Sequence, residues 1–461
     1  MKKFDLNIEK ILESWEIHHA VRELLANAID EQVMTNSQSI EVFKENETWI
    51  IRDYGRGIKY SSLTQNENEE KIKNPHVIGK FGIGLKDALA TLDRHDVQIE
   101  ILSKYNRIKT LKSPKEGFNE IVTLHALIDE NIQRDFVGTK IELKGISDED
   151  VEKAKRLFLM FSKNEILSRT KYGDVIHRGK ENAFIYINGV RVAEEDNFLF
   201  SYNITNVSSQ IKKALNRERT NVGRSAYADS IKKILLSSKD EKVAEMLAKE
   251  MAIIESGEAK DELSWIDIQE HAIKILSSTN KYVFITGDEA MTNTSMIDEI
   301  KNSGRTPIVI PLNLREKIKG GTDIGGNPIQ DINQFLFDYN DSFAFEFIDN
   351  KDLSDKERDT YSFTDKIINL FGGLPKQVKK IVISKTMRKD FVSNNETLGC
   401  WDAQTSAIVV HRSQLGKLPD YCGTLIHELI HAKTGLDDVD REFETELTKQ
   451  IGKFLSLYLE N

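Results

Sequence analysis

Three residues near the C-terminal end of the sequence have the types and the spacing of a metal-dependent hydrolytic site. His427, Glu428 and His431 form an H-E-x-x-H pattern in a segment whose apolar residues recur at helical spacing. Residues four apart lie one turn apart on a helix, so both imidazoles can bind one metal ion. Zinc suits these ligands, because a hydrolytic zinc site uses three protein ligands and leaves one position for water. Glu428 can take the proton of that water.

A third metal ligand is expected from the acidic segment that follows. Gly435 predicts the end of the helix, and residues 437–446 carry several carboxylates at the start of a second helix. Glu444 is the preferred ligand, with Glu446 and Asp440 as alternatives. H-E-x-x-H followed by a glutamate on the next helix resembles the gluzincin family of zinc metallopeptidases. That resemblance implies an endopeptidase; the alternative is a helix that carries the pattern by chance.

A second polar group interrupts an apolar helical pattern near the N-terminus. The periodicity predicts a helix over residues 7–34, and Glu23, Asn27 and Asp30 are four and three residues apart, so they share one face. An asparagine amide oxygen can bind Mg²⁺. A glutamate can activate an attacking water. The helix therefore carries the residue types of a nucleotide-hydrolysing site.

Two glycine-rich stretches follow this helix. Asp53 ends a predicted strand and can accept a hydrogen bond from an amino group such as that of adenine, while nearby glycines let the backbone come close. A glycine-rich helix start presents N–H groups to phosphate. The residues expected to bind the nucleotide are Asp53, Gly55, Gly57, Gly79, Gly82, Ile83, Gly84, Lys86 and Thr139. Each glycine-rich stretch alone would be an ordinary turn, but their order within one domain length favours ATP binding.

These segments resemble the motifs of the GHKL (Bergerat-fold) ATPases. The E-x-x-x-N-x-x-D box matches at Glu23, Asn27 and Asp30, and the D-x-G-x-G box begins at Asp53. The G-x-x-G-x-G box begins at Gly79, and a late G-T pair stands at residues 138–139. The resemblance implies Glu23 as general base, Asn27 as Mg²⁺ ligand, Asp53 as adenine reader and residues 58–81 as a lid. It also implies a nucleotide-dependent homodimer, and it places the chain nearer the gyrase, MutL and heat-shock-chaperone branch than the histidine kinases.

The middle of the chain is expected to couple the two sites. Asn216 to Arg219 looks similar to a chaperone segment that reaches the terminal phosphate, which makes Arg217 and Arg219 candidates; a solvated basic loop is the alternative. The predicted organisation is α/β (α+β) and multidomain. It has a Bergerat α/β sandwich over 1–165, a transducer-like α/β domain over 166–350 and a small zincin-like α+β domain over 351–461. In the last domain a strand over 406–411 is expected beside the metal helix, with His411 as a packed or surface histidine rather than a catalytic one.

Composition limits the remaining partners. The net charge of −10 and the lack of a long basic block argue against nucleic acid as the main partner. No apolar run has the length of a membrane span, the start lacks a signal-peptide pattern, and two cysteines suggest a reducing compartment. A cytoplasmic location without membrane contact is therefore expected.

Together these patterns predict a zinc endopeptidase that cleaves a protein substrate under the control of ATP and Mg²⁺. Such a combination fits bacterial stress response or defence against phage. Two other classes stay open: a chaperone-like remodelling ATPase whose zinc site is structural, and a nucleic-acid-linked ATPase.

Overall fold

The computed structural model is a mixed α/β protein with several sheets, which confirms the predicted fold class. It describes residues 1–6, 14–63, 71, 74, 76–79, 84–130, 135–180, 182–215, 222–254, 257–389, 397–436, 438 and 440–460. The chain forms two compact units, Met1–Ile275 and Leu276–Asn461.

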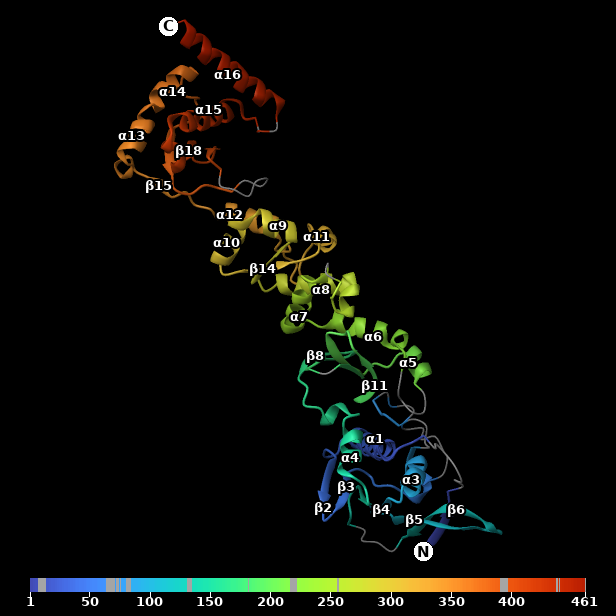
Figure 1. The fold of residues 1–461 in the computed structure, drawn as a ribbon. Helices are drawn as coiled ribbons and strands as arrows, with labels where there is room; N and C mark the ends of the chain where they lie inside the picture. Colours follow the sequence, from blue (N-terminus) through green and yellow to red (C-terminus); the bar gives the residue numbers. More distant parts are fainter. Residues whose placement is uncertain are drawn as a thin grey trace. The chain divides into compact units, whose positions relative to one another are not determined.

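The first unit begins with a seven-stranded antiparallel sheet that helices cover on one face (Figure 1). In spatial order its strands are β1 (Lys2–Asp5), β6 (Phe118–Asp129), β5 (Arg107–Lys115), β4 (Gln98–Ser103), β7 (Thr139–Lys144), β3 (Thr48–Asp53) and β2 (Glu41–Glu45). The helices are α1 (Ile17–Thr35), α3 (Gly84–Arg94) and α4 (Asp148–Lys155). Alternate residues of the inner strands, such as Ile99, Ile101, Ile141 and Leu143, are buried in one core with the apolar faces of these helices.

Helix α1 differs from the prediction at its start. The expected helix over 7–34 is wrong in this part: residues 14–16 precede the helix, and 7–13 lie outside the described residues. Glu16 is the N-cap residue, and its backbone N–H donates to His19 Nδ1 at 3.0 Å, in a capping box. This reciprocal bonding satisfies backbone donors that a helix leaves unpaired at its first turn.

A second sheet in this unit has five strands and is followed in the chain by four helices. Its spatial order is β11 (Val190–Glu195), β10 (Ala183–Ile187), β12 (Phe200–Ile204), β9 (Gly173–His177) and β8 (Ile166–Thr170). The helices that follow are α5 (Ser209–Ala214), α6 (Arg224–Ser237), α7 (Glu241–Met251) and α8 (Ile266–Ser277). Strands β10 and β12 are buried along their whole length, as the apolar runs of the sequence indicate.

The second unit contains a small β-α-β element, which the sequence predicts from apolar runs at 281–286 and 306–311 on either side of a helical stretch at about 292–303. Strands β13 (Tyr282–Ile285) and β14 (Thr306–Val309) are parallel, and the connection carries α9 (Gly287–Thr292) and α10 (Thr294–Asn302). Helices α11 (Leu312–Ile318) and α12 (Ile332–Asp341) follow.

A four-stranded sheet then positions the helix of the H-E-x-x-H pattern. Its order is β15 (Phe347–Ile348), β16 (Lys380–Ser384), β18 (Ala407–His411) and β17 (Gly399–Asp402). The helices are α13 (Asp355–Ser362), α14 (Thr364–Phe371), α15 (Leu418–Thr434) and α16 (Arg441–Leu459). Leu425, Leu429 and Ile430 of α15 are buried in the core beside β18, which leaves the polar face of α15 for chemistry.

Other helix boundaries also need correction. The sequence also predicts a connecting helix over 148–162, but the helix ends at Lys155. Beyond it the chain pairs with residues 189–191: Leu159 N–H donates to Gly189 O, and Arg191 N–H donates to Leu157 O. The sequence predicts one helix over 360–371, but the structure has two helices that meet at Phe363. The last helix begins at Arg441 rather than at residue 438. None of the described helices has both the length and the apolar composition needed to cross a bilayer.

Candidate functional sites

The two histidines of α15 meet as their spacing predicts. The Nε2 atoms of His427 and His431 lie 3.0 Å apart. The Asp438 carboxylate reaches both: its Oδ1 is 2.8 Å from His427 Nε2 and 3.1 Å from His431 Nε2. Among the described residues, these three form the one group whose ligand atoms converge closely enough for a metal ion.

The turn after α15 brings Asp438 to this position. Gly435 ends the helix with a φ of +72°, a left-handed conformation that glycine adopts without strain. The reversed chain places the Leu436 carbonyl 2.7 Å from His431 Nδ1. Since a carbonyl only accepts hydrogen bonds, Nδ1 carries the proton and the lone pair of Nε2 is left for a metal, the usual outer contact of a metal-binding histidine.

The carboxylates preferred from the sequence lie elsewhere. Glu444 is exposed on α16 and is not part of the convergent group. Glu446 pairs with Lys433 and Lys449, and Asp440 is the N-cap residue of α16. The neighbouring Phe443 instead stacks on the His431 ring, with 4.3 Å between the ring centroids. Glu444 stays a prediction, and Asp438 joins it as a ligand candidate that the sequence reasoning missed.

Two substitutions test whether Asp438 or Glu444 is the third metal ligand. Asp438→Ala is expected to weaken zinc binding by more than the roughly 10- to 100-fold that loss of an outer contact costs, because it removes one of three converging ligands. Glu444→Ala is the matched control and should leave the zinc affinity unchanged. Competition of each variant with a fluorescent zinc chelator measures both values. The opposite pattern would assign the site to Glu444.

Glu428 is held in a buried position against an edge strand. Its side chain is packed between α15 and β17, and a Cβ built on Gly399 would lie 2.8 Å from Glu428 Cγ and 2.6 Å from Thr424 Cγ2. Burial raises the pKa of Glu428 to about 7, while a hydrogen bond from the Trp401 backbone acts in the opposite direction. A general base with a pKa near the working pH transfers protons efficiently.

This burial predicts a pH effect on the metal-free protein. The folded state favours the neutral form of Glu428. Burial of this side chain therefore costs no folding stability below the ordinary pKa of 4.5, and the free energy of unfolding falls as the pH rises through about 7. Glu428→Gln should remove this loss, because its amide does not titrate. Hydrogen exchange of α15 in chelator-treated protein between pH 5 and 8 would measure it. Equal pH dependence in both proteins would contradict the assigned burial effect.

The polar face of α1 forms the second candidate site. Asp30 is fully buried and accepts hydrogen bonds from the backbone N–H groups of Ile78 and Gly79, the latter at 2.7 Å. Lys71 Nζ lies 3.1 Å from Asp30 Oδ2 and 3.2 Å from Asn27 Oδ1. The first and third predicted boxes therefore meet at Gly79.

Glu23 joins the same site from one turn earlier. A Cβ built on Gly84, the first residue of α3, would lie 2.3 Å from Glu23 Oε2, so glycine is needed there for space. Arg22 Nε donates to Glu23 Oε1 at 3.1 Å. The carboxylate of the predicted general base thus lies at the start of the helix expected to bind phosphate.

Asp53 is placed by the pairing of β3 with β7. It is buried opposite Thr139, its Oδ1 accepts the Gly55 N–H at 3.0 Å, and burial raises its pKa. Gly138 has a φ of +74°, and a Cβ there would lie 2.1 Å from Asp53 O. Gly57, with a φ of +83°, would place a Cβ 2.9 Å from Gly138 O. The predicted adenine reader therefore sits where two glycines let three chain segments approach.

Gly138→Ala tests this close approach. It is expected to destabilise the first unit by more than the roughly 1–3 kcal/mol of a left-handed non-glycine residue, because a backbone clash adds to the strain. Gly189→Ala is the matched control: its φ is +80°, with no atom within 4 Å of the added Cβ. Urea unfolding of the full chain, followed by hydrogen exchange in β3 and β7 for the first variant and in β10 and β11 for the second, measures both. Equal losses of unfolding free energy in the two variants would mean that the backbone near Asp53 shifts without cost to accommodate the added methyl group.

The remaining predicted residues are not all brought to this site. Lys86 is buried on α3 with its Nζ 5.8 Å from the Phe4 ring, and burial lowers its pKa. Gly55 packs against the Glu31 side chain, which pairs with Arg56. Gly82, Ile83, Arg217 and Arg219 lie outside the described residues, so their predicted roles stay predictions.

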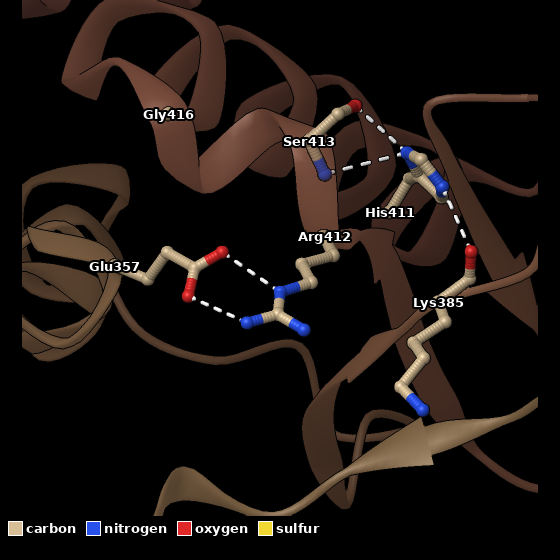
Figure 2. A pocket seen from close by; sticks show the side chains of 6 residues that line it. All are labelled: Glu357, Lys385, His411, Arg412, Ser413 and Gly416. Atoms are coloured by element: carbon tan, nitrogen blue, oxygen red, sulfur yellow. Dashed lines mark hydrogen bonds and ion pairs between the residues drawn. The ribbon is translucent and has the colours of Figure 1, made fainter. Parts of the chain in front are cut away.

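A pocket in the second unit lies between α13 and the carboxyl ends of β16 and β18 (Figure 2). Its polar groups bond to one another: Arg412 donates to both carboxylate oxygens of Glu357, and this holds the pKa of Glu357 at about 2. His411 contacts Ser413 Oγ at 2.7 Å and Lys385 O at 3.0 Å. His411 is half-buried and bonded within the pocket, so its prediction as a packed or surface histidine rather than a catalytic one stays a prediction.

Two proteins of Mycoplasma pneumoniae are similar to parts of this chain. One is 42% identical over 244 residues, which are 52% of this chain and 98% of that protein. The second is 31% identical over 146 residues, which are 31% of this chain and 41% of that protein. Both are described only as uncharacterized proteins. Residues 149–241, which include the five-stranded sheet, match the family described as the Mycoplasma pneumoniae MPN635 N-terminal domain.

Proposed function

We propose that this chain is a zinc endopeptidase controlled by ATP. It belongs to the same family as the 42% identical Mycoplasma pneumoniae protein, of which it covers 98%. One observation carries the peptidase part of this proposal: the convergence of His427, His431 and Asp438 beside the buried Glu428. No comparison assigns an activity, so the proposal rests on the two sites.

The donor set fits zinc. Two imidazole nitrogens and one carboxylate oxygen are ligands that zinc accepts, and three protein ligands leave a position for water. When bound, zinc would supply a nucleophilic water near neutral pH and polarise a carbonyl. His431 is oriented for this role by its bond to the Leu436 carbonyl. Glu428 is not needed as a ligand, so it is available to accept a proton.

Edge strand β17 offers a place for the substrate. It is the last strand of its sheet, and α15 packs beside it. An edge strand has unpaired backbone groups that an extended peptide can bind as an added strand. Gly399 begins this strand and contacts Glu428, so a peptide paired with β17 would pass the proposed base.

The ATP part is supported by the assembly around α1. Two pairs of predicted motifs meet from segments far apart in sequence: the first and third through Asp30 and Gly79, and the second and fourth through Asp53 and Thr139. The glycines keep space that side chains would fill, and Asn27 Oδ1 already faces a cation, the Lys71 ammonium. Asn27 and Asp30 would hold Mg²⁺, Asp53 would accept the adenine amino group, and Glu23 would orient water.

Proteolysis by zinc-loaded protein, with and without ATP and Mg²⁺, tests the combined function. New peptide termini in a cell lysate would be mapped by mass spectrometry. We expect cleavage that requires Glu428 and that rises with ATP only when Asn27 is intact, with Glu428→Gln and Asn27→Ala as the two control variants. ATP hydrolysis without Glu428-dependent cleavage would favour the chaperone-like alternative. Steeply salt-dependent DNA affinity would favour the nucleic-acid-linked ATPase.

A further inference from the structure

One lysine occupies the centre of the polar group on α1. Lys71 Nζ lies 3.2 Å from Asn27 Oδ1 and 3.1 Å from Asp30 Oδ2, and its side chain is largely buried at 16% exposure. A Cβ built on Gly79 would lie 3.7 Å from the same nitrogen and 3.8 Å from Asn27 Oδ1. The ammonium is thus enclosed by the side chains of one helix and by the backbone that Asp30 holds.

The atoms around this ammonium are those that a divalent cation would use. An amide oxygen and a carboxylate oxygen converge on one point, and a positive charge stands there. Mg²⁺ binds oxygen at roughly 2.0–2.1 Å and keeps several waters. An ammonium at hydrogen-bonding distance and a hydrated Mg²⁺ cannot occupy the same point. Their like charges add a Coulomb penalty, which is larger at a buried site than in water.

We propose that the Lys71 ammonium holds the divalent-cation position when nucleotide is absent and competes there with Mg²⁺ for the Asn27 and Asp30 oxygens. This inference rests on the nucleotide site of the proposed function. It adds Lys71, which is not a motif residue, and it links the position of Lys71 to the occupancy of the cation site. Entry of Mg²⁺ with a nucleotide removes Lys71 from Asn27, so the position of residue 71 reports whether the site is loaded.

The alternative for Lys71 is a phosphate ligand. In that case the lysine assists Mg–nucleotide binding, and its removal weakens affinity. Replacing Lys71 should therefore raise the affinity for Mg–nucleotide if the lysine competes with Mg²⁺, and lower it if the lysine binds phosphate. An ordinary ion pair with Asp30 alone predicts no change in affinity at all.

Calorimetric titration of a non-hydrolysable ATP analogue into the full-length protein measures whether the affinity rises or falls. If Lys71 blocks the position about 90% of the time, Lys71→Met tightens binding in excess Mg²⁺ about tenfold, since apparent affinity scales with the competent fraction. Without Mg²⁺ the variant gains nothing. Lys109→Met is the matched control, because exposed Lys109 also pairs with a carboxylate, that of Glu100 at 2.9 Å, outside the predicted site. Weaker or unchanged binding by Lys71→Met in Mg²⁺ overturns the proposal.

A second measurement does not depend on nucleotide. Mn²⁺ alone, followed by electron paramagnetic resonance, should bind Lys71→Met about tenfold more tightly than wild type by the same arithmetic, and Asn27→Ala should abolish the gain. Equal Mn²⁺ affinities overturn the proposal by themselves. If wild type binds Mn²⁺ with the expected difference but no ATP analogue, the cation site stands and the proposed nucleotide function fails.

Discussion

Glu428→Gln is expected to lower zinc-dependent peptide cleavage by roughly 100- to 10,000-fold, the usual contribution of a general base. The amide keeps the size of the side chain in the space beside Gly399 but cannot accept the proton of a water molecule. The zinc content should stay unchanged, because Glu428 is not one of the three converging ligands. Initial rates on the substrates named by terminus mapping, with metal analysis of the same samples, measure both quantities.

Glu442→Gln is the matched control for this substitution. Glu442 is exposed at the start of α16 and should be replaceable without loss of rate. A Glu428→Gln variant that loses zinc together with activity would contradict the separation of base and ligands. A variant that keeps full activity would remove the peptidase proposal.

Asp53→Asn is expected to weaken ATP binding by roughly 10- to 100-fold, since a hydrogen bond to a charged group contributes about 1.5–3 kcal/mol. Asp53 is buried at the junction of β3 and β7, where the amide of asparagine fits in volume but offers a weaker acceptor to an amino group. Titration with the ATP analogue measures the loss. An analogue whose adenine amino group is absent should bind both proteins equally weakly.

Asp93→Asn provides the control. Asp93 lies on α3 and pairs with Lys112, outside the group around α1. Its replacement should leave the affinity for ATP unchanged. Equal losses in Asp53→Asn and Asp93→Asn would indicate a general change in the first unit rather than a lost adenine contact.

The sequence predicted elements with strong periodicity better than short ones. Helix α15 and the buried strands β10, β12 and β18 were expected, because their apolar residues follow one clear spacing. Strands β1, β5, β8, β9, β11, β15 and β17 were not expected. Strand β17 illustrates the reason: Gly399 to Asp402 has no alternation, and it becomes a strand through pairing with β18.

The site residues, too, could be predicted from the sequence only where local spacing determines their arrangement. His427, Glu428 and His431 lie within one helix, so their arrangement follows from helical spacing alone. Asp438 depends on the left-handed turn at Gly435, and several acidic residues nearby were equally plausible from sequence. Gly399 and Lys71 come from segments that only the folded chain places beside Glu428 and Asn27. A glycine at the start of a strand and a lysine in a polar stretch gave no signal of these contacts.

The turn at Gly435 also makes the candidate metal centre a local one. All three converging ligands belong to residues 427–438, so the chain gathers them by closing a single short loop. The entropy lost in closing a loop grows with its length, which keeps this loss small compared with docking of distant segments. A metal ion would therefore need only α15 and this loop to be in place, because no ligand comes from the first unit. The binding free energy of the metal would then stabilise the end of α15 directly.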